Sequence, residues 1–165
     1  MEVGEIERGP FENFLGERFE SGDRRVARGL WDAVFALSEG NPSDTQQLCA
    51  ALWDTTEPGT LLASEHMGGA LMHIFATERK GFESIIKSLT DNQLKCLRAL
   101  ARIGGEQPQS KRFLAESGIK LPASVKRSLT RLENLGVVYG SDRAHRFFDP
   151  FFRQWLLTDM AERVG

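Results

Sequence analysis

Residues that start and end helices recur at short intervals in the second half of the chain. Thr90-Asp91-Asn92-Gln93 has the pattern of a capping box, in which the first and fourth side chains satisfy free N–H groups at a helix start. Ser110 can cap a short second helix, and a third helix runs from about Ala123 to Leu135. Glycines end these helices, at Gly104-Gly105, Gly118 and Gly136. The pattern predicts three helices in direct succession.

The apolar pattern changes from helical to strand-like after this point. Val137-Val138-Tyr139 and His145-Arg146-Phe147-Phe148 read as two strands, and Gly140-Ser141-Asp142 between them has the composition of a turn. Asp149-Pro150 then starts a last helix. Helix, short helix, helix and hairpin, in this order, is the arrangement of a winged helix-turn-helix. Because a lone hairpin is marginal in water, we expect it to pack against the three helices.

The first half carries helical patterns divided by short breaks. Ser43-Asp44-Thr45-Gln46 is a further capping box, and a longer helix follows Ser64, with a kink or break expected near Gly81. The breaks contain glycine or proline, and they are Gly9-Pro10, Ser21-Gly22-Asp23, Gly40-Asn41-Pro42 and Pro58-Gly59. The predicted fold class is therefore mainly α, with a helical bundle before a winged helix-turn-helix that carries a small β-hairpin wing.

Apolar residues at helical spacing indicate the buried faces of these helices. In the first three helices we expect the core to include Phe11, Phe14, Leu15, Phe19, Val26, Leu30, Val34, Leu48, Cys49, Leu52 and Trp53. We also assign the aromatic run Phe147-Phe148, Phe151-Phe152 and Trp155 to the core rather than to a ligand site.

The charge of the chain is unevenly distributed. Residues 1–90 hold 8 Lys and Arg against 15 Asp and Glu, a net charge of −7, whereas residues 91–165 hold 13 against 8, a net charge of +5. Different partners for the two halves would explain this asymmetry, and so would two ordinary solvated surfaces. No apolar run is long enough to span a membrane, and Cys49 and Cys96 read as buried free thiols. We therefore expect a cytoplasmic protein without a membrane partner.

The third helix of the second half is the candidate recognition helix. Val125, Leu129 and Leu132 form its apolar side, and a polar, mainly basic set falls on the other side. Lysine and arginine neutralise phosphates, and arginine and asparagine also read base edges. The candidate residues for binding DNA or a protein partner are Lys126, Arg127, Thr130, Arg131 and Asn134 on this helix, Lys111 and Arg112 before it, and Arg143, His145 and Arg146 on the wing.

The sequence offers no set of residues that converges on catalysis. His66 and His73 can share a helix face, but no third ligand accompanies them at a metal-like spacing. Glu65 and Glu83 lack a carboxylate partner at a motif spacing, and signatures of a serine or cysteine nucleophile are absent. The phosphate-binding loop G-x-x-x-x-G-K-[ST] is also missing. We therefore expect no enzyme activity, no metal site and no cofactor in this chain by itself.

Three segments, in this order, resemble the C-terminal portion of an archaeal-type (STAND-clade) AAA+ ATPase, which is a helical lid followed by a winged helix. They are Leu37-Ser38-Glu39-Gly40-Asn41-Pro42 with Gln46-Gln47-Leu48-Cys49 after it, Ser88-Leu89-Thr90-Asp91-Asn92-Gln93-Leu94, and the run from Arg146 to Leu156. The resemblance implies a lid-like subdomain over residues 1–76, a connecting helix over 77–89 and the winged helix-turn-helix with its C-terminal helix over 90–165. It also implies that Gly40, Asn41 and Pro42 contact the adenine side of ATP held by an upstream P-loop domain. A plain helix-ending turn explains the same three residues equally well.

The chain departs from that family in lacking the P-loop, the acidic Walker B strand and a sensor arginine, whose place Ser43 takes. Our leading hypothesis is therefore a non-catalytic C-terminal fragment of an ATPase. ATP or ADP binds only in the longer parent, and the lid relays the nucleotide state to a winged helix that binds DNA or a partner protein, by a rigid-body movement near Gly81. The alternatives are a self-contained DNA-binding transcription regulator and a protein–protein interaction module.

Overall fold

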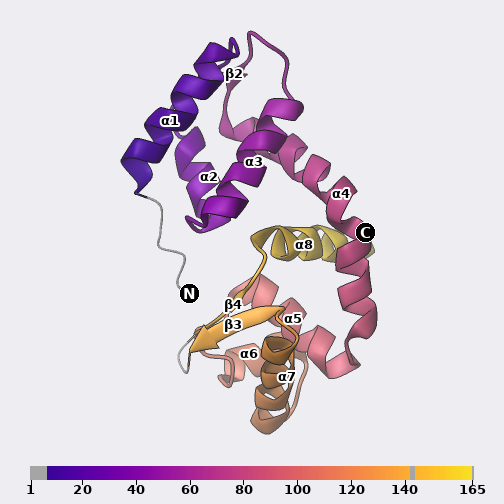
Figure 1. Ribbon diagram of the computed structural model, residues 1–165. Coiled ribbons are helices and arrows are strands. Elements are labelled where there is room, and N and C mark those ends of the chain that lie inside the picture. Colours follow the sequence, from indigo (N-terminus) through magenta and orange to yellow (C-terminus); the bar gives the residue numbers. More distant parts are fainter. Residues whose placement is uncertain (1–6, 142–143, 165) are drawn as a thin grey trace. The chain divides into compact units, whose positions relative to one another are not determined.

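The computed structural model describes residues 7–141 and 144–164. The chain forms two compact units, an N-terminal unit, Met1–Glu78, and a C-terminal unit, Arg79–Gly165 (Figure 1). The prediction of a mainly α fold with a small β-hairpin is confirmed. Within the described ranges, no helix is both long and apolar enough to cross a membrane.

The N-terminal unit is built from α1 (Arg8–Ser21), α2 (Leu30–Ser38), α3 (Pro42–Asp54) and the first part of α4 (Met67–Ser88), with a 3₁₀ turn at Ser64–His66. Strands β1 (Arg25–Val26) and β2 (Leu61–Leu62) pair in parallel, with Val26 opposite Leu62. The sequence pattern placed Val26 on a helix, and this assignment was wrong. The core includes Leu30, Val34, Leu48, Leu52 and Leu62, all of which are completely buried.

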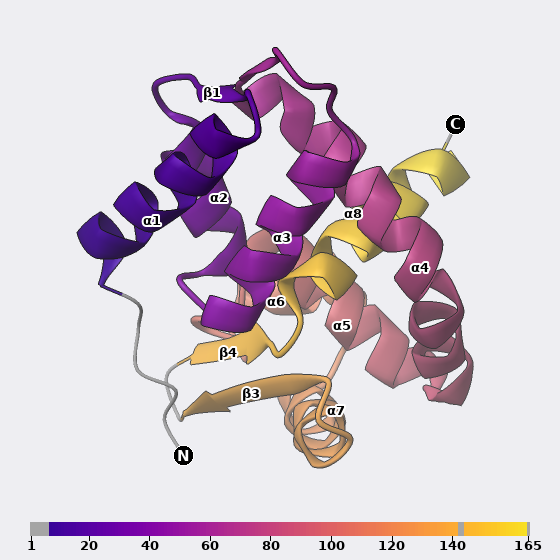
Figure 2. The same cartoon turned by 45° about the horizontal axis from the view of Figure 1, so that its top comes forward.

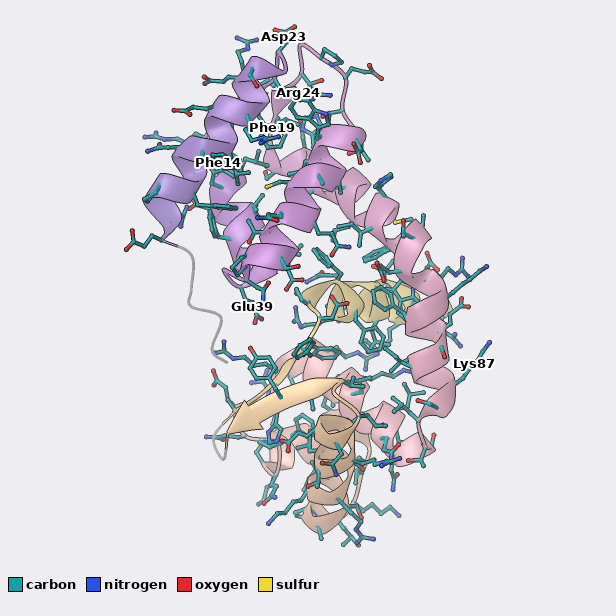
Figure 3. The ribbon with its side chains drawn as sticks, in the orientation of Figure 1. Phe14, Phe19, Asp23, Arg24, Glu39 and Lys87 are labelled. Carbon is teal, nitrogen blue, oxygen red and sulfur yellow. The ribbon has the colours of Figure 1, made fainter. Side chains whose placement is uncertain are left out.

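Two aromatic residues of this unit are more exposed than the helical pattern predicted. Phe14 is 52% exposed and Trp53 is 36% exposed, whereas Phe19 is buried (Figure 3). The guanidinium of Arg24 covers the Trp53 ring at 3.9 Å from its centroid and donates hydrogen bonds to three backbone carbonyls. Arg24 is only 6% exposed, so these carbonyls and the ring replace the water that its charge has lost.

The third helix begins two residues earlier than the capping pattern suggested. The Asn41 side chain accepts hydrogen bonds from the backbone N–H groups of Ser43 at 3.0 Å and Asp44 at 3.2 Å, and Pro42 occupies the first turn. Asn41 is therefore the N-cap, and Ser43 lies inside the helix. The break expected at Gly81 is also absent, because α4 continues through this residue.

The C-terminal unit contains α5 (Asp91–Ile103), α6 (Lys111–Ser117), α7 (Pro122–Asn134), β3 (Val138–Ser141), β4 (Ala144–Phe147) and α8 (Pro150–Val164). The expected caps are present: Thr90 and Gln93 cap α5 reciprocally, and Ser110 caps α6. The antiparallel hairpin pairs Val138 with Phe147 and Tyr139 with Arg146. Figure 2 shows this hairpin beside α7, the helix that precedes it.

Aromatic rings fill much of the core of this unit. Phe152 stacks on Phe82 at 5.1 Å between ring centroids and meets Phe147 edge to face at 6.0 Å. Phe113 and Phe151 are also fully buried. Phe148 is the exception to the predicted aromatic core, because it is 70% exposed.

Candidate functional site

Helix α7 presents its polar side to solvent, as the helical spacing predicts. Val125, Ser128, Leu129 and Leu132 are buried against the rest of the unit. The opposite side is exposed and carries the candidate residues Lys126, Arg127, Thr130, Arg131 and Asn134. Gly118 and Gly136, at the ends of α6 and α7, have φ of +70° and +72°, a conformation that glycine adopts without strain. The tight turns at Gly118 and Gly136 therefore set the direction of α7, whose exposed side is basic.

The cations of this surface have no carboxylate partners among the described residues. Salt bridges in the same unit join Lys95 to Asp91 at 2.7 Å and Arg102 to Glu116 at 3.1 Å. Within the described part of the chain, no such bridge involves the exposed residues Lys111, Arg112, Lys126, Arg127 or Arg131. Their positive field therefore acts outward, on whatever approaches the helix-turn-helix.

The wing holds its candidate residues in different environments. Arg146 on β4 is exposed, and no salt bridge within the described ranges involves it. His145 is turned inward, where Nε2 lies 2.7 Å from a carboxylate oxygen of Glu133 on α7 and the side chain is 14% exposed. Its backbone N–H donates to the carbonyl of Gly105 at 2.8 Å, so this residue ties the wing to the body of the unit. Arg143 lies outside the described residues.

A hollow of about 580 Å³ is lined by residues of α7, of the wing and of the loop before α6. Of the candidate residues it brings together Lys126, Thr130 and His145, and the loop segment 106–110 forms its other wall. Lys111, Arg112, Arg127 and Arg131 are not among its lining residues. The candidate set therefore forms a broad polar surface and not a closed pocket.

Exposed aromatic residues on the wing were missed from the sequence. Tyr139 is 48% and Phe148 is 70% exposed, and their rings meet edge to face at 6.4 Å between centroids. The sequence could have predicted the exposure of Phe148, because side chains alternate along a strand. A buried Phe147 therefore places Phe148 on the other face.

The other candidate positions lie in the N-terminal unit. Gly40 has a φ of +71°, and the amide oxygen of Asn41 is used in capping α3. His66 Nδ1 accepts a hydrogen bond from the N–H of Ala63 at 3.0 Å, and His73 Nε2 lies 3.9 Å from Asp54. In residues 7–141 and 144–164, no three His, Cys, Asp or Glu side chains are grouped as a metal ion requires. Cys49 and Cys96 are free and buried, as expected.

The element order, the hairpin register and the short bridge from Gly105 to His145 together define a winged helix-turn-helix. Residues 80–158, just under half of the chain, match the family model described as a probable winged helix domain. Neither the curated proteins nor the solved structures include a match to the chain. The C-terminal unit thus contains a winged helix domain, a fold that serves both DNA and protein binding.

Proposed function

We propose that the C-terminal unit binds duplex DNA, with α7 in the major groove. The observation that carries the proposal is the set of exposed cations on α6 and α7 that have no carboxylate partner in the described part of the chain. The unit holds 16 Lys and Arg against 9 Asp and Glu, a net charge of +7. Phosphate contacts draw on such a field, and they supply most of the sequence-independent affinity for DNA.

The arrangement of α7 also provides for base contacts. A major groove admits one helix, whose exposed side meets the base edges. Arg127, Arg131 and Asn134 are side chains of the types that pair with guanine or adenine there. We assign the phosphate contacts to Lys111, Arg112 and Lys126, which are exposed on α6 and α7. The proposal is for a binding protein and not an enzyme.

The affinity of the full chain for a duplex of about twenty base pairs tests this proposal, measured by fluorescence anisotropy at low salt. We expect Lys126→Glu combined with Arg131→Glu to weaken binding at least about tenfold, because two attractive charges become repulsive. Lys80→Glu combined with Lys87→Glu is the matched control, since both lysines are exposed on α4 in the same unit and change the net charge equally (Figure 3 labels Lys87).

The control separates a local surface from a general effect of charge. Equal loss of affinity in both double variants would show that binding follows net charge and would remove α7 from the interface. Wild-type protein that binds no duplex, but captures a protein partner with no dependence on salt, would assign the unit to protein contacts instead.

We further propose that the N-terminal unit is the lid of an ATPase whose nucleotide is held by a P-loop domain. The resemblance in segment 37–49 motivates this, together with the position of Asn41 on the surface of the turn that starts α3. The Asn41 amide caps the helix, its N–H donates to Ser38 and its carbonyl accepts from Thr45, so the backbone of Gly40 is the part left for a contact with adenine.

The genomic reading frame upstream of the chain tests the ATPase proposal. We expect it to encode a G-x-x-x-x-G-K-[ST] loop and an acidic strand in frame with Met1. A stop codon directly upstream, with no P-loop gene beside it, would contradict the proposal without affecting the assignment of DNA binding to α7.

A further inference from the structure

The β-hairpin of the wing has one buried face and one exposed face. Val138 and Phe147 are paired in register and are 2% and 6% exposed. The next pair in register is Tyr139 with Arg146, and alternation along the strands places both on the opposite face. Phe148 follows on the same side as Arg146. We call these three residues, Tyr139, Arg146 and Phe148, the wing face.

The two rings of the wing face form a small aromatic surface in contact with water. Phe148 is two residues from the direct partner of Tyr139, a diagonal spacing at which rings on neighbouring strands reach each other. The planes of the two rings are at 87°, so each ring keeps part of its area free. The helix-turn-helix does not cover this surface, since Tyr139 and Phe148 are 48% and 70% exposed. Both rings are therefore accessible to a ligand.

The charge beside the rings limits the kind of partner. Arg146 is exposed directly across from Tyr139, and no described carboxylate forms a salt bridge with it. An apolar protein surface that covered the rings would also remove water from this unpaired cation, which is unfavourable. A ligand with flat π-faces and negative charges satisfies the rings and the cation together, and nucleic acid has both. In a duplex the base faces are covered by their neighbours, so only unpaired bases can stack on the wing.

We propose that the wing face binds single-stranded nucleic acid, with one or two unpaired bases stacked on Tyr139 and Phe148 and a neighbouring phosphate on Arg146. The inference rests on the proposed function in assigning nucleic acid to the C-terminal unit. It uses different residues and a different form of the ligand, so that each proposal can fail alone.

The first test reads Tyr139 directly. It is the only tyrosine of the chain, so 3-fluorotyrosine incorporated into the full-length protein gives one fluorine resonance. We expect this resonance to shift on addition of an oligothymidine of about twelve nucleotides, because a stacked base changes the ring-current field at the tyrosine. A resonance that does not move at saturating oligonucleotide would overturn the proposal.

The second test measures affinity for the same oligothymidine. We expect Tyr139→Ala combined with Phe148→Ala to weaken binding about tenfold and to leave duplex affinity within about twofold. Tyr139→Phe combined with Phe148→Tyr keeps both rings and should bind as wild type. Leu61→Ala combined with Met72→Ala is the control, because it removes two exposed apolar side chains, 50% and 60% exposed, from the N-terminal part of the chain. If the double alanine variant does not fold, Arg146→Gln provides the test, with an expected loss of about threefold.

The outcomes separate the two proposals. Wild-type protein that binds the duplex but not the oligothymidine overturns the inference and leaves the role of α7 intact. Protein that binds the oligothymidine but not the duplex supports the inference and contradicts the role of α7. The wild-type protein could instead self-associate and not bind oligothymidine. If the double alanine variant then loses this self-association, the wing face binds a second copy of the chain, and the inference is overturned.

Discussion

At the scale of the residue, Asn41 decides where α3 begins. Its amide oxygen accepts hydrogen bonds from two backbone N–H groups that otherwise have no partner in the first turn of a helix. Proline follows at a position where its fixed φ suits the helix and its missing N–H is not needed. The Gly-Asn-Pro segment therefore has a complete structural role before any nucleotide is considered.

Replacing the cap tests this assignment. We expect Asn41→Ala to lower the free energy of unfolding by about 1 kcal/mol, because two N–H groups lose their acceptor. Ser43→Ala is the matched control and should change it by less than about 0.5 kcal/mol, since this residue only donates its backbone N–H. Urea unfolding followed by circular dichroism measures both free energies of unfolding. A larger loss in Ser43→Ala than in Asn41→Ala would show that Ser43 is the cap.

Asp149 caps α8 while it is partly buried, and the two effects on its pKa are opposed. Burial raises the pKa of this carboxyl above its ordinary value, and hydrogen bonds from the N–H groups of Phe151 at 2.8 Å and Phe152 at 3.3 Å lower it by less. A carboxyl whose pKa is higher in the folded chain favours folding below its unfolded pKa, and this contribution is lost as the pH rises through the folded pKa.

Asp149→Asn keeps the hydrogen-bond acceptor and removes the charge. We expect the variant to gain stability relative to wild type as the pH rises from acid towards neutral, because only the wild-type side chain becomes a buried anion. Thermal unfolding across this pH range measures the difference. A wild-type protein that becomes the more stable of the two at neutral pH would show that the backbone hydrogen bonds outweigh burial.

Single residues differ in how much their sequence context reveals. The caps at Thr90 and Ser110 were predicted because a cap and its partners lie within one turn. The burial of Arg24 was not predicted, because its side chain donates to the carbonyls of Trp53 and Thr56. These residues lie 29 and 32 positions further along the chain. No local pattern encodes such a contact, and the same applies to the contact between His145 Nε2 and the Glu133 carboxylate.

At the scale of the element, α4 shows that one glycine does not end a helix when the flanking residues favour it. The helix continues through Gly81, which is exposed and has open space around its Cα. Glycine inside a helix costs up to about 1 kcal/mol relative to alanine.

We therefore expect Gly81→Ala to raise the free energy of unfolding by up to about 1 kcal/mol, because alanine reduces the freedom of the unfolded chain at a position already helical. Gly118→Ala is the control, since its φ of +70° strains any L residue, and it should be destabilising. Differential scanning calorimetry shows whether each variant is more or less stable than the wild-type protein. A Gly81→Ala variant less stable than wild type would mean that the helix needs flexibility there.

Elements with a strong local pattern were predicted, and elements made by distant contacts were not. The three helices of the helix-turn-helix and the hairpin follow from caps, glycines and a change of apolar period. Strands β1 and β2 have two residues each and lie about 35 residues apart, too short for an alternating pattern. The exposure of Phe14 and Trp53 also depends on which neighbours α1 and α3 acquire, which helical spacing alone does not state.

At the scale of the whole molecule, two units of opposite charge are joined in one chain. The N-terminal unit holds 5 Lys and Arg against 14 Asp and Glu, a net charge of −9, and the C-terminal unit carries +7. Nucleic acid is therefore attracted to one unit and repelled by the other.

Each unit also contains one buried thiol, Cys49 in the first and Cys96 in the second. Burial raises the pKa of each to about 12, so both are protonated and covered at neutral pH. We expect neither to react with iodoacetamide in the native chain at about pH 8, and both to react once urea unfolds it. Mass spectrometry after peptide digestion counts the labels, and rapid labelling of one cysteine in native buffer would show that its unit opens.

The dependence of duplex affinity on salt is the most direct test of the role assigned to α7. A plot of log affinity against log salt concentration has a slope of about −0.9 for each phosphate neutralised. We expect wild-type protein to give a steep negative slope. Lys126→Glu combined with Arg131→Glu should make the slope shallower by at least about one unit, because Lys126 is assigned to a phosphate, and Lys80→Glu combined with Lys87→Glu should leave it unchanged. A flat wild-type slope, or one that the α7 variant leaves unaltered, would contradict the account.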